Sequence, residues 1–332
     1  MPSRASLRAE RRSAPAAGGT PRAAGTGDRF RLPFKWAGGK RQLLPVLRRC
    51  YPATFQAYYE PFFGSGAVFF DLATSGRLDG RRAVLTDINP DVVGCYRAIR
   101  DSTDELVAHL ERLAAGHAAG GADHYYAVRD GRFNPLRSRV LAERGDGRLA
   151  YPPELAAMFI YLNRTGFNGL FRVNARGRFN VPMGRYRNPR ICDPDGLKQA
   201  AVLLARPGVE LGCQEYGTAL HAAAAGDFVY LDPPYAPVST TARFTGYTPE
   251  GFGADHQSRL QKVVLDLAGR QCHVLLSNST APVIGRLYED SAEARACGLR
   301  VHRVQARRAI NSRPGQRGAV AEYLVTTSRT LV

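Results

Sequence analysis

The sequence lacks the features of several common classes of protein. Its six cysteines lie far apart and include no Cys-x-x-Cys pair, so the ligand spacing of a zinc site is absent. No apolar run approaches the length of a membrane span, and the N-terminus has no hydrophobic stretch of the kind that a secretory signal carries. We therefore expect a cytoplasmic protein with reduced cysteines, no metal and no membrane association.

Lysine and acidic residues are also scarce. Lysine accounts for four of the 46 basic residues and arginine for the other 42, against 29 acidic residues, which gives a net charge of +17. A GC-rich genome also produces such an arginine bias, so the distribution is more informative than the total. Two stretches, residues 155–192 and 295–321, contain no acid and seven arginines each. Solvated faces usually mix signs, so these stretches favour contact with the phosphates of a nucleic acid.

The first residues have a different composition. Residues 1–29 consist largely of Ala, Gly, Pro, Ser and Arg and carry six arginines against Glu10 and Asp28. They have too little apolar surface to offset the loss of chain entropy on folding. We expect a disordered basic tail over residues 1–32, with the folded part beginning at Phe34. DNA attraction, an organellar presequence and no role at all remain open for this tail.

The first folded segment has the pattern of an α/β cofactor site. An apolar run from Ala57 leads into the turn Gly64-Ser65-Gly66 and then into a helical pattern, and a second apolar run ends in Asp87. Glycines let the backbone approach a ligand, and an acid at the end of the next strand can bind both ribose hydroxyls. A third glycine for a dinucleotide pyrophosphate is missing, and residues 35–40 do not form a Walker A loop. The pattern therefore favours a nucleoside cofactor over NAD or ATP.

The second half of the chain predicts more strands of the same sheet. Ala- and Leu-rich helical stretches separate most of them, which is typical of a mainly parallel sheet with helices on both faces, and the last two form a predicted antiparallel pair. The predicted fold class is α/β. Beyond the strands ending at Glu60 and Asp87, the predicted strands are residues 209–213, 228–231, 273–276, 301–306 and 322–327.

Residues 96–190 interrupt this alternation. They contain predicted helices at residues 103–115 and 154–162, separated by a Gly/Ala/His-rich linker at residues 116–122. They also hold the first acid-free stretch, where arginines lie among asparagines and aromatic residues. Arginine and asparagine can read base edges, and an aromatic ring can wedge between bases. We predict an insert that recognises nucleic acid.

The tetrapeptide Asp232-Pro233-Pro234-Tyr235 follows a predicted strand and suggests a reaction. The exocyclic amine of a nucleobase is a poor nucleophile, because its lone pair is delocalised into the ring. Hydrogen bonds from the amine to the Asp232 carboxylate and the Pro233 carbonyl favour a geometry that localises this pair. The prolines stiffen the loop, and Tyr235 offers a face on which an extruded base can stack. The alternative is an ordinary strand followed by a turn.

Five motifs in order give the chain, from Phe34 to Thr327, a resemblance to the Dam-type (class alpha, D12) DNA adenine N6-methyltransferases. The motifs are Lys35-Trp36-Ala37-Gly38-Gly39-Lys40, Glu60-Pro61-Phe62-Phe63-Gly64-Ser65-Gly66, Thr86-Asp87-Ile88-Asn89, Asn168-Gly169-Leu170 leading to Phe179-Asn180-Val181-Pro182, and Asp232-Pro233-Pro234-Tyr235. The resemblance implies a Rossmann-like methyltransferase sheet formed by residues 33–95 and 191–332. It also implies that residues 96–190 form an inserted, mainly helical target-recognition domain.

The resemblance assigns the cofactor and the roles of individual residues. It implies S-adenosylmethionine as methyl donor, direct in-line transfer to adenine N6 and no metal, with Lys40 a partner for the donor's carboxylate. The implied catalytic residues are Asp232, Pro233 and Tyr235. The implied cofactor-binding residues are Trp36, Lys40, Phe62, Gly64, Gly66, Asp87 and Asp232.

The resemblance also implies how DNA is recognised. Arg172 matches a position that reads guanine, and Phe167-Asn168 matches an aromatic–Asn pair near the point of intercalation, with phenylalanine where some relatives have tyrosine. The implied recognition sequence is GATC, and the arginines between Arg308 and Glu322 would contact the DNA backbone. The implied DNA-binding residues are Arg164, Phe167, Asn168, Arg172, Asn180 and Arg185.

The expected partner is double-stranded DNA, bound by a monomer in the cytoplasm, in association with the nucleoid. A solitary regulator and the protective partner of a restriction endonuclease both fit the sequence. Three alternatives stay open: transfer to cytosine N4 or to an RNA adenine, a DNA-binding protein without catalysis, and a protein that depends on NAD or ATP.

Overall fold

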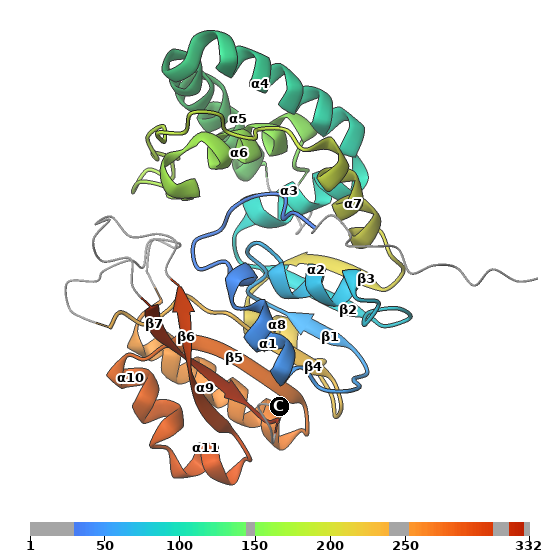
Figure 1. The fold of residues 1–332 in the computed structure, drawn as a ribbon, viewed down its shortest axis with the longest axis vertical. Helices are drawn as coiled ribbons and strands as arrows, with labels where there is room; N and C mark the ends of the chain where they lie inside the picture. Colours follow the sequence, from blue (N-terminus) through green and yellow to red (C-terminus); the bar gives the residue numbers. More distant parts are fainter. Residues whose placement is uncertain (1–29, 144–149, 239–251, 308–318, 329–332) are drawn as a thin grey trace, which may run out of the picture.

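The computed structural model describes residues 30–143, 150–238, 252–307 and 319–328. A seven-stranded sheet with the order β3-β2-β1-β4-β5-β7-β6 lies at its centre (Figure 1). The five strands β1 to β5 pair in parallel, whereas β7 is antiparallel to both of its neighbours, which confirms the predicted sheet. The strands are β1 Tyr58–Glu60, β2 Ala83–Asp87, β3 Val209–Cys213, β4 Phe228–Leu231, β5 His273–Ser279, β6 Arg300–Arg307 and β7 Ala319–Thr326.

Successive strand residues pack on opposite faces of the sheet. Tyr58 and Phe228 belong to one hydrophobic cluster, whereas the next residues, Tyr59 and Val229, belong to the other. Both faces are therefore buried, which explains why the central strands carry apolar residues on both faces. The first face is covered by α1 Leu44–Leu47, α2 Ala67–Thr74, α3 Pro90–Asp101 and α7 Pro194–Leu204, and the second by α8 Tyr216–Leu220, α9 Ala254–Gly269, α10 Pro282–Ile284 and α11 Ala292–Ala296.

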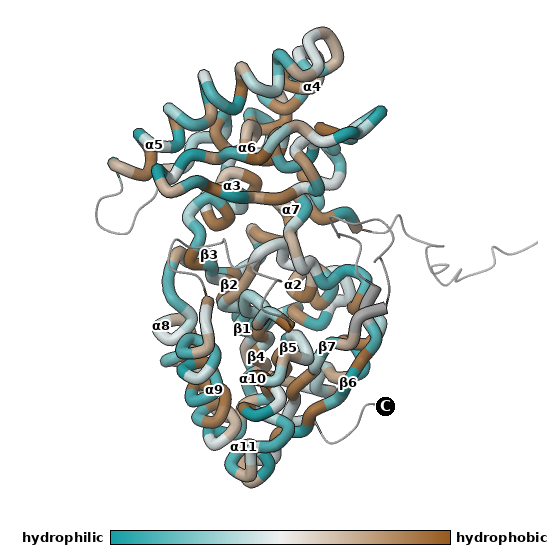
Figure 2. Tube along the Cα trace, turned by 90° about the vertical axis from the view of Figure 1, so that its left-hand side faces the viewer, coloured by the Kyte–Doolittle hydropathy of each residue, from teal (hydrophilic) through white to brown (hydrophobic). Residues whose placement is uncertain are grey.

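Three further helices, α4 Thr103–Tyr126, α5 Asn134–Ala142 and α6 Pro153–Thr165, lie together beyond one end of the sheet (Figures 1 and 2). A π-helical segment, Ala127–Phe133, joins α4 to α5. The predicted linker at residues 116–122 is wrong, because these residues continue α4 and only Gly121 leaves helical geometry, with φ 48° and ψ −119°. Alanines favour the helix, and the packing of α4 against α6 outweighs the cost of its glycines.

The helical end shares its core with the first face of the sheet. Helix α3 runs across the expected boundary at residue 96, and Tyr96 is buried with its ring 4.6 Å from that of Phe63. Its hydroxyl donates to the Gly64 carbonyl at 3.2 Å. The buried residues of α4 and α6 belong to the same cluster as Tyr58. The helical end is thus fixed directly to the sheet.

Two details at the start of the chain differ from expectation. The ring of Phe30 stacks on Phe70 at 4.6 Å, so packed residues begin before Phe34, while residues 1–29 of the expected tail lie outside the described residues. The apolar segment Gln42–Leu47, whose pattern in the sequence is helical, begins at the end of a 3₁₀ turn, Lys40–Gln42, and continues into the short α1. Pro45 lies in the first turn of α1, where its missing N–H costs no hydrogen bond. A second 3₁₀ turn, Arg48–Cys50, follows.

None of the helices in the described part of the chain is long and apolar enough to cross a membrane.

Glu60, the last residue of β1, gives the fold a pH dependence. It is 2% exposed, and its Oε2 accepts hydrogen bonds from the Tyr58 hydroxyl at 2.7 Å and the Phe69 N–H at 3.1 Å. Burial raises the pKa of Glu60 from 4.5 to about 8. The unfolded chain releases this proton near the ordinary pKa, so stability falls as pH rises through that window, by about 1.4 kcal/mol per pH unit.

We expect Glu60→Gln to remove this contribution, because the amide oxygen can accept both hydrogen bonds without ionising. Urea unfolding at several pH values between 4.5 and about 8 should show a smaller loss of unfolding free energy for the variant than for the wild type. Parallel curves for the two proteins would contradict the assignment.

Candidate active site

The sheet brings two distant segments of sequence together at its centre. Strands β1 and β4 are adjacent and parallel, with Tyr58 opposite Phe228, and the order of the strands reverses between them. Ligands of open α/β sheets bind outside the carboxyl ends of the strands at such a point. The glycine turn after β1 and Asp232 after β4 therefore lie at the same edge of the sheet.

The turn after β1 is fixed by the acid at the end of β2. Gly64 and Gly66 have φ values of 46° and 65°, which favour glycine, and a Cβ on Gly64 would lie 2.7 Å from Cδ1 of Trp36. Asp87 accepts the Gly64 N–H through Oδ2 and the Asn89 N–H through Oδ1, each at 2.9 Å. Burial raises the pKa of Asp87 to about 6, so it is mainly ionised at pH 7.

Aromatic and apolar side chains surround this turn. Trp36 is half-buried and stacks on Phe171 with ring centroids 6.1 Å apart, and Phe62 stacks on Tyr216 at 5.3 Å. Ile88, which follows Asp87, is 56% exposed, and sequence reasoning missed it although an apolar residue directly after this acid was a usable signal. A carboxylate and apolar surface at one edge fit a nucleoside cofactor.

The Asp232 carboxylate is held from two sides. Lys40 Nζ lies 2.7 Å from Oδ1 of Asp232, and the Ser277 hydroxyl donates to the same oxygen at 2.9 Å. Burial raises the pKa of Asp232, while Lys40 and Ser277 oppose that rise. Lys40 is only 5% exposed, and its ammonium also donates to the Gly38 carbonyl and lies 4.6 Å from the centre of the Tyr235 ring. Lys40, which we expected to bind the carboxylate of the methyl donor, thus contacts Asp232, the expected catalytic acid.

Neighbouring elements brace the rest of the loop. Gln257 of α9 donates to the Pro234 carbonyl at 2.9 Å, and Tyr235 donates to Oε2 of Glu322 on β7 at 2.7 Å. The Asn278 side chain accepts the Ala236 N–H at 3.2 Å. Sequence reasoning missed these supports. The only available signal was the polar run Ser277-Asn278-Ser279 at the carboxyl end of a predicted strand, which pairs with β4.

Two acceptors of the loop stay unused. Among the described residues, none donates a hydrogen bond to Oδ2 of Asp232 or to the Pro233 carbonyl. The first oxygen of Asp232 is occupied by Lys40 and Ser277, and the next carbonyl, that of Pro234, by Gln257. The loop therefore holds two acceptors ready for an incoming amine.

Most of the expected DNA-contacting residues lie on one group of loops after α6. Residues 172–180, which we call the basic hairpin, close through a bridge between Val173 and Phe179, and Arg172 Nε donates to Oδ1 of Asn180 at 2.9 Å. A second bridge, Gly166–Met183, places the Phe167–Gly169 turn beside this hairpin. Phe167 is 44% exposed, Asn168 has a left-handed φ of 56°, and Arg172 and Arg185 are exposed. The structure thus joins Arg172 to Asn180 and places Phe167, Asn168 and Arg185 on the loops that these two bridges connect.

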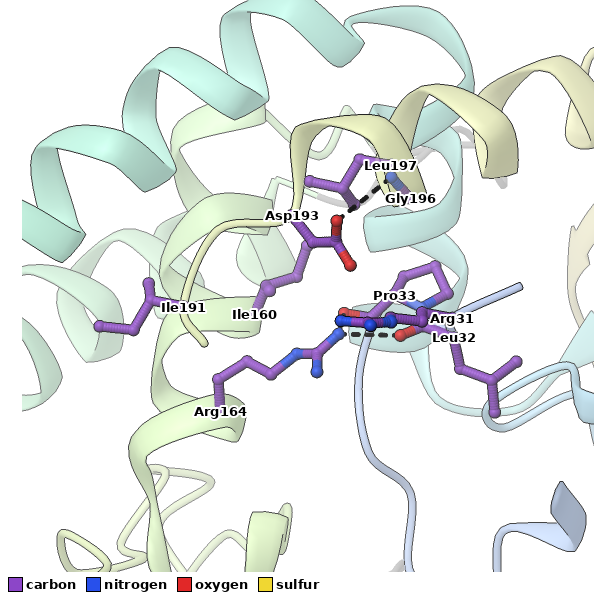
Figure 3. A pocket seen from close by; sticks show the side chains of 9 residues that line it. All are labelled: Arg31, Leu32, Pro33, Ile160, Arg164, Ile191, Asp193, Gly196 and Leu197. Carbon is purple, nitrogen blue, oxygen red and sulfur yellow. Dashed lines mark hydrogen bonds between the residues drawn. The ribbon is translucent and has the colours of Figure 1, made fainter. Parts of the chain in front are cut away.

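Arg164 lies elsewhere. Its Nη2 donates to the carbonyls of Leu32 and Pro33, both at 2.8 Å, and Figure 3 shows the guanidinium pointing at this backbone. Burial lowers its pKa. The geometry favours a structural role for Arg164, fixing the N-terminal segment, over the expected contact with DNA.

Other arginines of the acid-free stretches pair with acids that lie just outside these stretches. Arg190 lies 2.8 Å from Asp193, and Arg303 lies 2.7 Å from Glu289. A local absence of acids in the sequence therefore overstates the free positive charge, because the fold supplies the missing carboxylates. The arginines expected to contact the DNA backbone after residue 307 lie outside the described residues.

Comparison with known proteins gives consistent matches. The model of the family "D12 class N6 adenine-specific DNA methyltransferase" matches residues 36–310. The chain is 36% identical over 300 residues to the type II methyltransferase M1.LlaDCHI of Lactococcus lactis subsp. cremoris, an alignment that covers 89% of this chain and 94% of the relative. It is 36% identical to the type II methyltransferase M.MjaIII of Methanocaldococcus jannaschii, over 86% of this chain and 94% of the relative. It is 34% identical to the DNA adenine methylase of Escherichia coli K12, over 88% and 93%.

Proposed function

Because this chain belongs to the D12 class of N6 adenine-specific DNA methyltransferases, we propose that it transfers a methyl group from S-adenosylmethionine to adenine N6 in duplex DNA, at GATC. The observation that carries the proposal is the pair of acceptors, Asp232 Oδ2 and the Pro233 carbonyl, which receive no hydrogen bond from the described residues and lie at the same edge of the sheet as the glycine turn. Two acceptors on one rigid loop match the two hydrogens of an exocyclic amine.

The residues at this edge of the sheet would hold the methyl donor. When bound, S-adenosylmethionine supplies a methyl group activated by a positively charged sulfur. Asp87 has lone pairs beyond those that accept from Gly64 and Asn89, and these can receive ribose hydroxyls. Trp36, Phe62 and the exposed Ile88 offer apolar surface. Lys40 has three N–H donors, so it can hold Asp232 and the Gly38 carbonyl and still bind the donor's carboxylate.

The loop then acts through alignment. The target amine donates to Asp232 and the Pro233 carbonyl, which localises its lone pair for attack, and the ring of Tyr235 stacks on the extruded base. Glu322 fixes that ring through the tyrosine hydroxyl. Lys40 and Ser277 keep the carboxylate oriented and oppose the rise in its pKa that burial causes.

The basic hairpin supplies the proposed sequence recognition. Asn180 occupies Nε of Arg172, which leaves the two terminal nitrogens as the donors for O6 and N7 of a guanine. The exposed Phe167 can wedge into the duplex, and Asn168 and Arg185 lie next to it along these loops. We assign GATC by the resemblance to Dam-type enzymes. The relatives carry both names, type II methyltransferase and DNA adenine methylase, so a restriction partner and a solitary role both fit; we propose a cytoplasmic, nucleoid-associated monomer.

Asp232→Ala tests the catalytic assignment. Loss of one of two preorganised acceptors should lower methyl transfer on the order of 10²–10³-fold. Duplex affinity should stay within about twofold, because the basic hairpin is unchanged. Tritium transfer from labelled S-adenosylmethionine and anisotropy of a labelled GATC duplex measure the two quantities. Asp266→Ala, which removes a carboxylate paired with Arg270 on the outside of α9, is the control and should behave as wild type. Undiminished transfer by Asp232→Ala would contradict the proposal.

Arg172→Ala tests the recognition assignment. We expect discrimination at one guanine of the site to weaken by about 1–3 kcal/mol, because a bidentate contact is lost. The measurement is kcat/KM on GATC and on duplexes that carry one replaced base pair. Arg178→Ala, at another exposed position of the basic hairpin, should weaken all duplexes equally. If Arg172→Ala also weakened all of them equally, Arg172 would be a phosphate contact.

A further inference from the structure

Asn163 joins the expected cofactor segment to the expected recognition loops. It lies in the last turn of α6 and is 2% exposed. Its Oδ1 accepts the Lys35 N–H at 2.8 Å, and its Nδ2 donates to the carbonyls of Lys35 at 2.8 Å and Gly169 at 2.9 Å. One buried amide therefore holds the residue before Trp36 and the end of the Phe167–Gly169 turn at the same time.

The two segments that Asn163 holds also pack tightly on each other. Gly169 has a φ of 63°, and a Cβ there would lie 2.6 Å from Cδ of Lys35. Lys35 Nζ lies 4.3 Å from the centre of the exposed Tyr186 ring, which follows the basic hairpin. Residue 35 thus contacts the recognition loops through its backbone and its side chain.

On the other side, the contact continues into the cofactor turn. The Trp36 ring lies against Gly64, where a Cβ would fall 2.7 Å from it, and it stacks on Phe171 just before the basic hairpin. An unbroken series of contacts therefore runs from Gly64 through Trp36 and Lys35 to Gly169. Buried amides in such a junction are satisfied in one arrangement only, so neither segment can shift alone without breaking hydrogen bonds.

We propose that Asn163 is a positioning residue that makes the binding of the methyl donor and of DNA mutually dependent. The inference rests on the proposed function, since it takes the two ligands from there. A ligand that orders the Lys35–Trp36 segment also orders the Phe167–Gly169 turn through Asn163, so the second ligand meets a smaller loss of conformational entropy. Linkage makes the effect reciprocal, and couplings of this kind change affinity by about 5- to 150-fold.

The wild-type protein gives the first test. Trp36 is the only tryptophan in the chain, so its fluorescence reports on the cofactor segment. Titration with S-adenosylhomocysteine, an unreactive donor analogue, and anisotropy of a labelled GATC duplex give each affinity with and without the other ligand. We expect each ligand to tighten the other at least fivefold, and DNA alone to change Trp36 emission. Two ligands that bind independently would overturn the inference alone, whereas failure of either ligand to bind even in the presence of the other would overturn the proposed function as well.

The variant Asn163→Asp tests the residue itself. It keeps the size and the acceptor for the Lys35 N–H but loses the donor to the Lys35 and Gly169 carbonyls. We expect the mutual tightening to fall toward onefold, with a smaller change in the affinity for S-adenosylhomocysteine alone. Thr165→Val is the matched control, because it removes a buried hydroxyl from the same helix whose bond goes to the Tyr161 carbonyl within that helix. It should keep the wild-type coupling.

A purely structural role for Asn163 would give different results for Asn163→Asp. In that case the melting temperature of Asn163→Asp would fall while the coupling stayed at its wild-type value, and that result would overturn the inference. If Asn163→Asp does not fold, Asn163→Ser provides the same comparison with a smaller, neutral side chain.

Discussion

The adjacency of β1 and β4 is the constraint on which the rest of the site depends. Parallel strands place their carboxyl ends at the same edge, so the glycine turn after Glu60 and the acid after Leu231 meet although about half of the chain separates them. The ion pair between Lys40 and Asp232 then closes this junction from the N-terminal side. The proposed sites for the cofactor, the target amine and the DNA are all located relative to this edge of the sheet.

The proposed transfer depends on the rigidity of this loop. Asp232 and Ala236 are bonded to β5, Pro234 to α9 and Tyr235 to β7, so three neighbouring elements hold the loop and its two remaining acceptors in place before any ligand arrives. Preorganised acceptors cost no reorganisation at the moment of reaction. Hydrogen bonds also fix the other end of the site, where the side-chain amide of Asn163 bonds to the backbone of both Lys35 and Gly169.

The sequence predicted what depends on local pattern. Apolar runs located every strand, and the positions of Gly64, Asp87 and Asp232 followed from strand ends and turn chemistry. It could not predict partners that only the fold brings together. Ser277 and Glu322 hydrogen-bond to the loop from strands far away in sequence. Lys40 forms an ion pair with Asp232, and Arg164 donates to the carbonyl of Leu32. The linker error in α4 has a related cause, since packing against α6 overrides its glycines.

We propose that the two acceptors after β4 hold an exocyclic amine and that the recognition loops make it the amine of adenine in duplex DNA. Base-resolution sequencing of unmethylated DNA treated with the purified protein and S-adenosylmethionine tests it most directly. The account predicts N6-methyladenine at the adenine of GATC and at no other base. Methylation of cytosine N4, modification of RNA alone, or no modification under conditions in which the protein binds the duplex would contradict it.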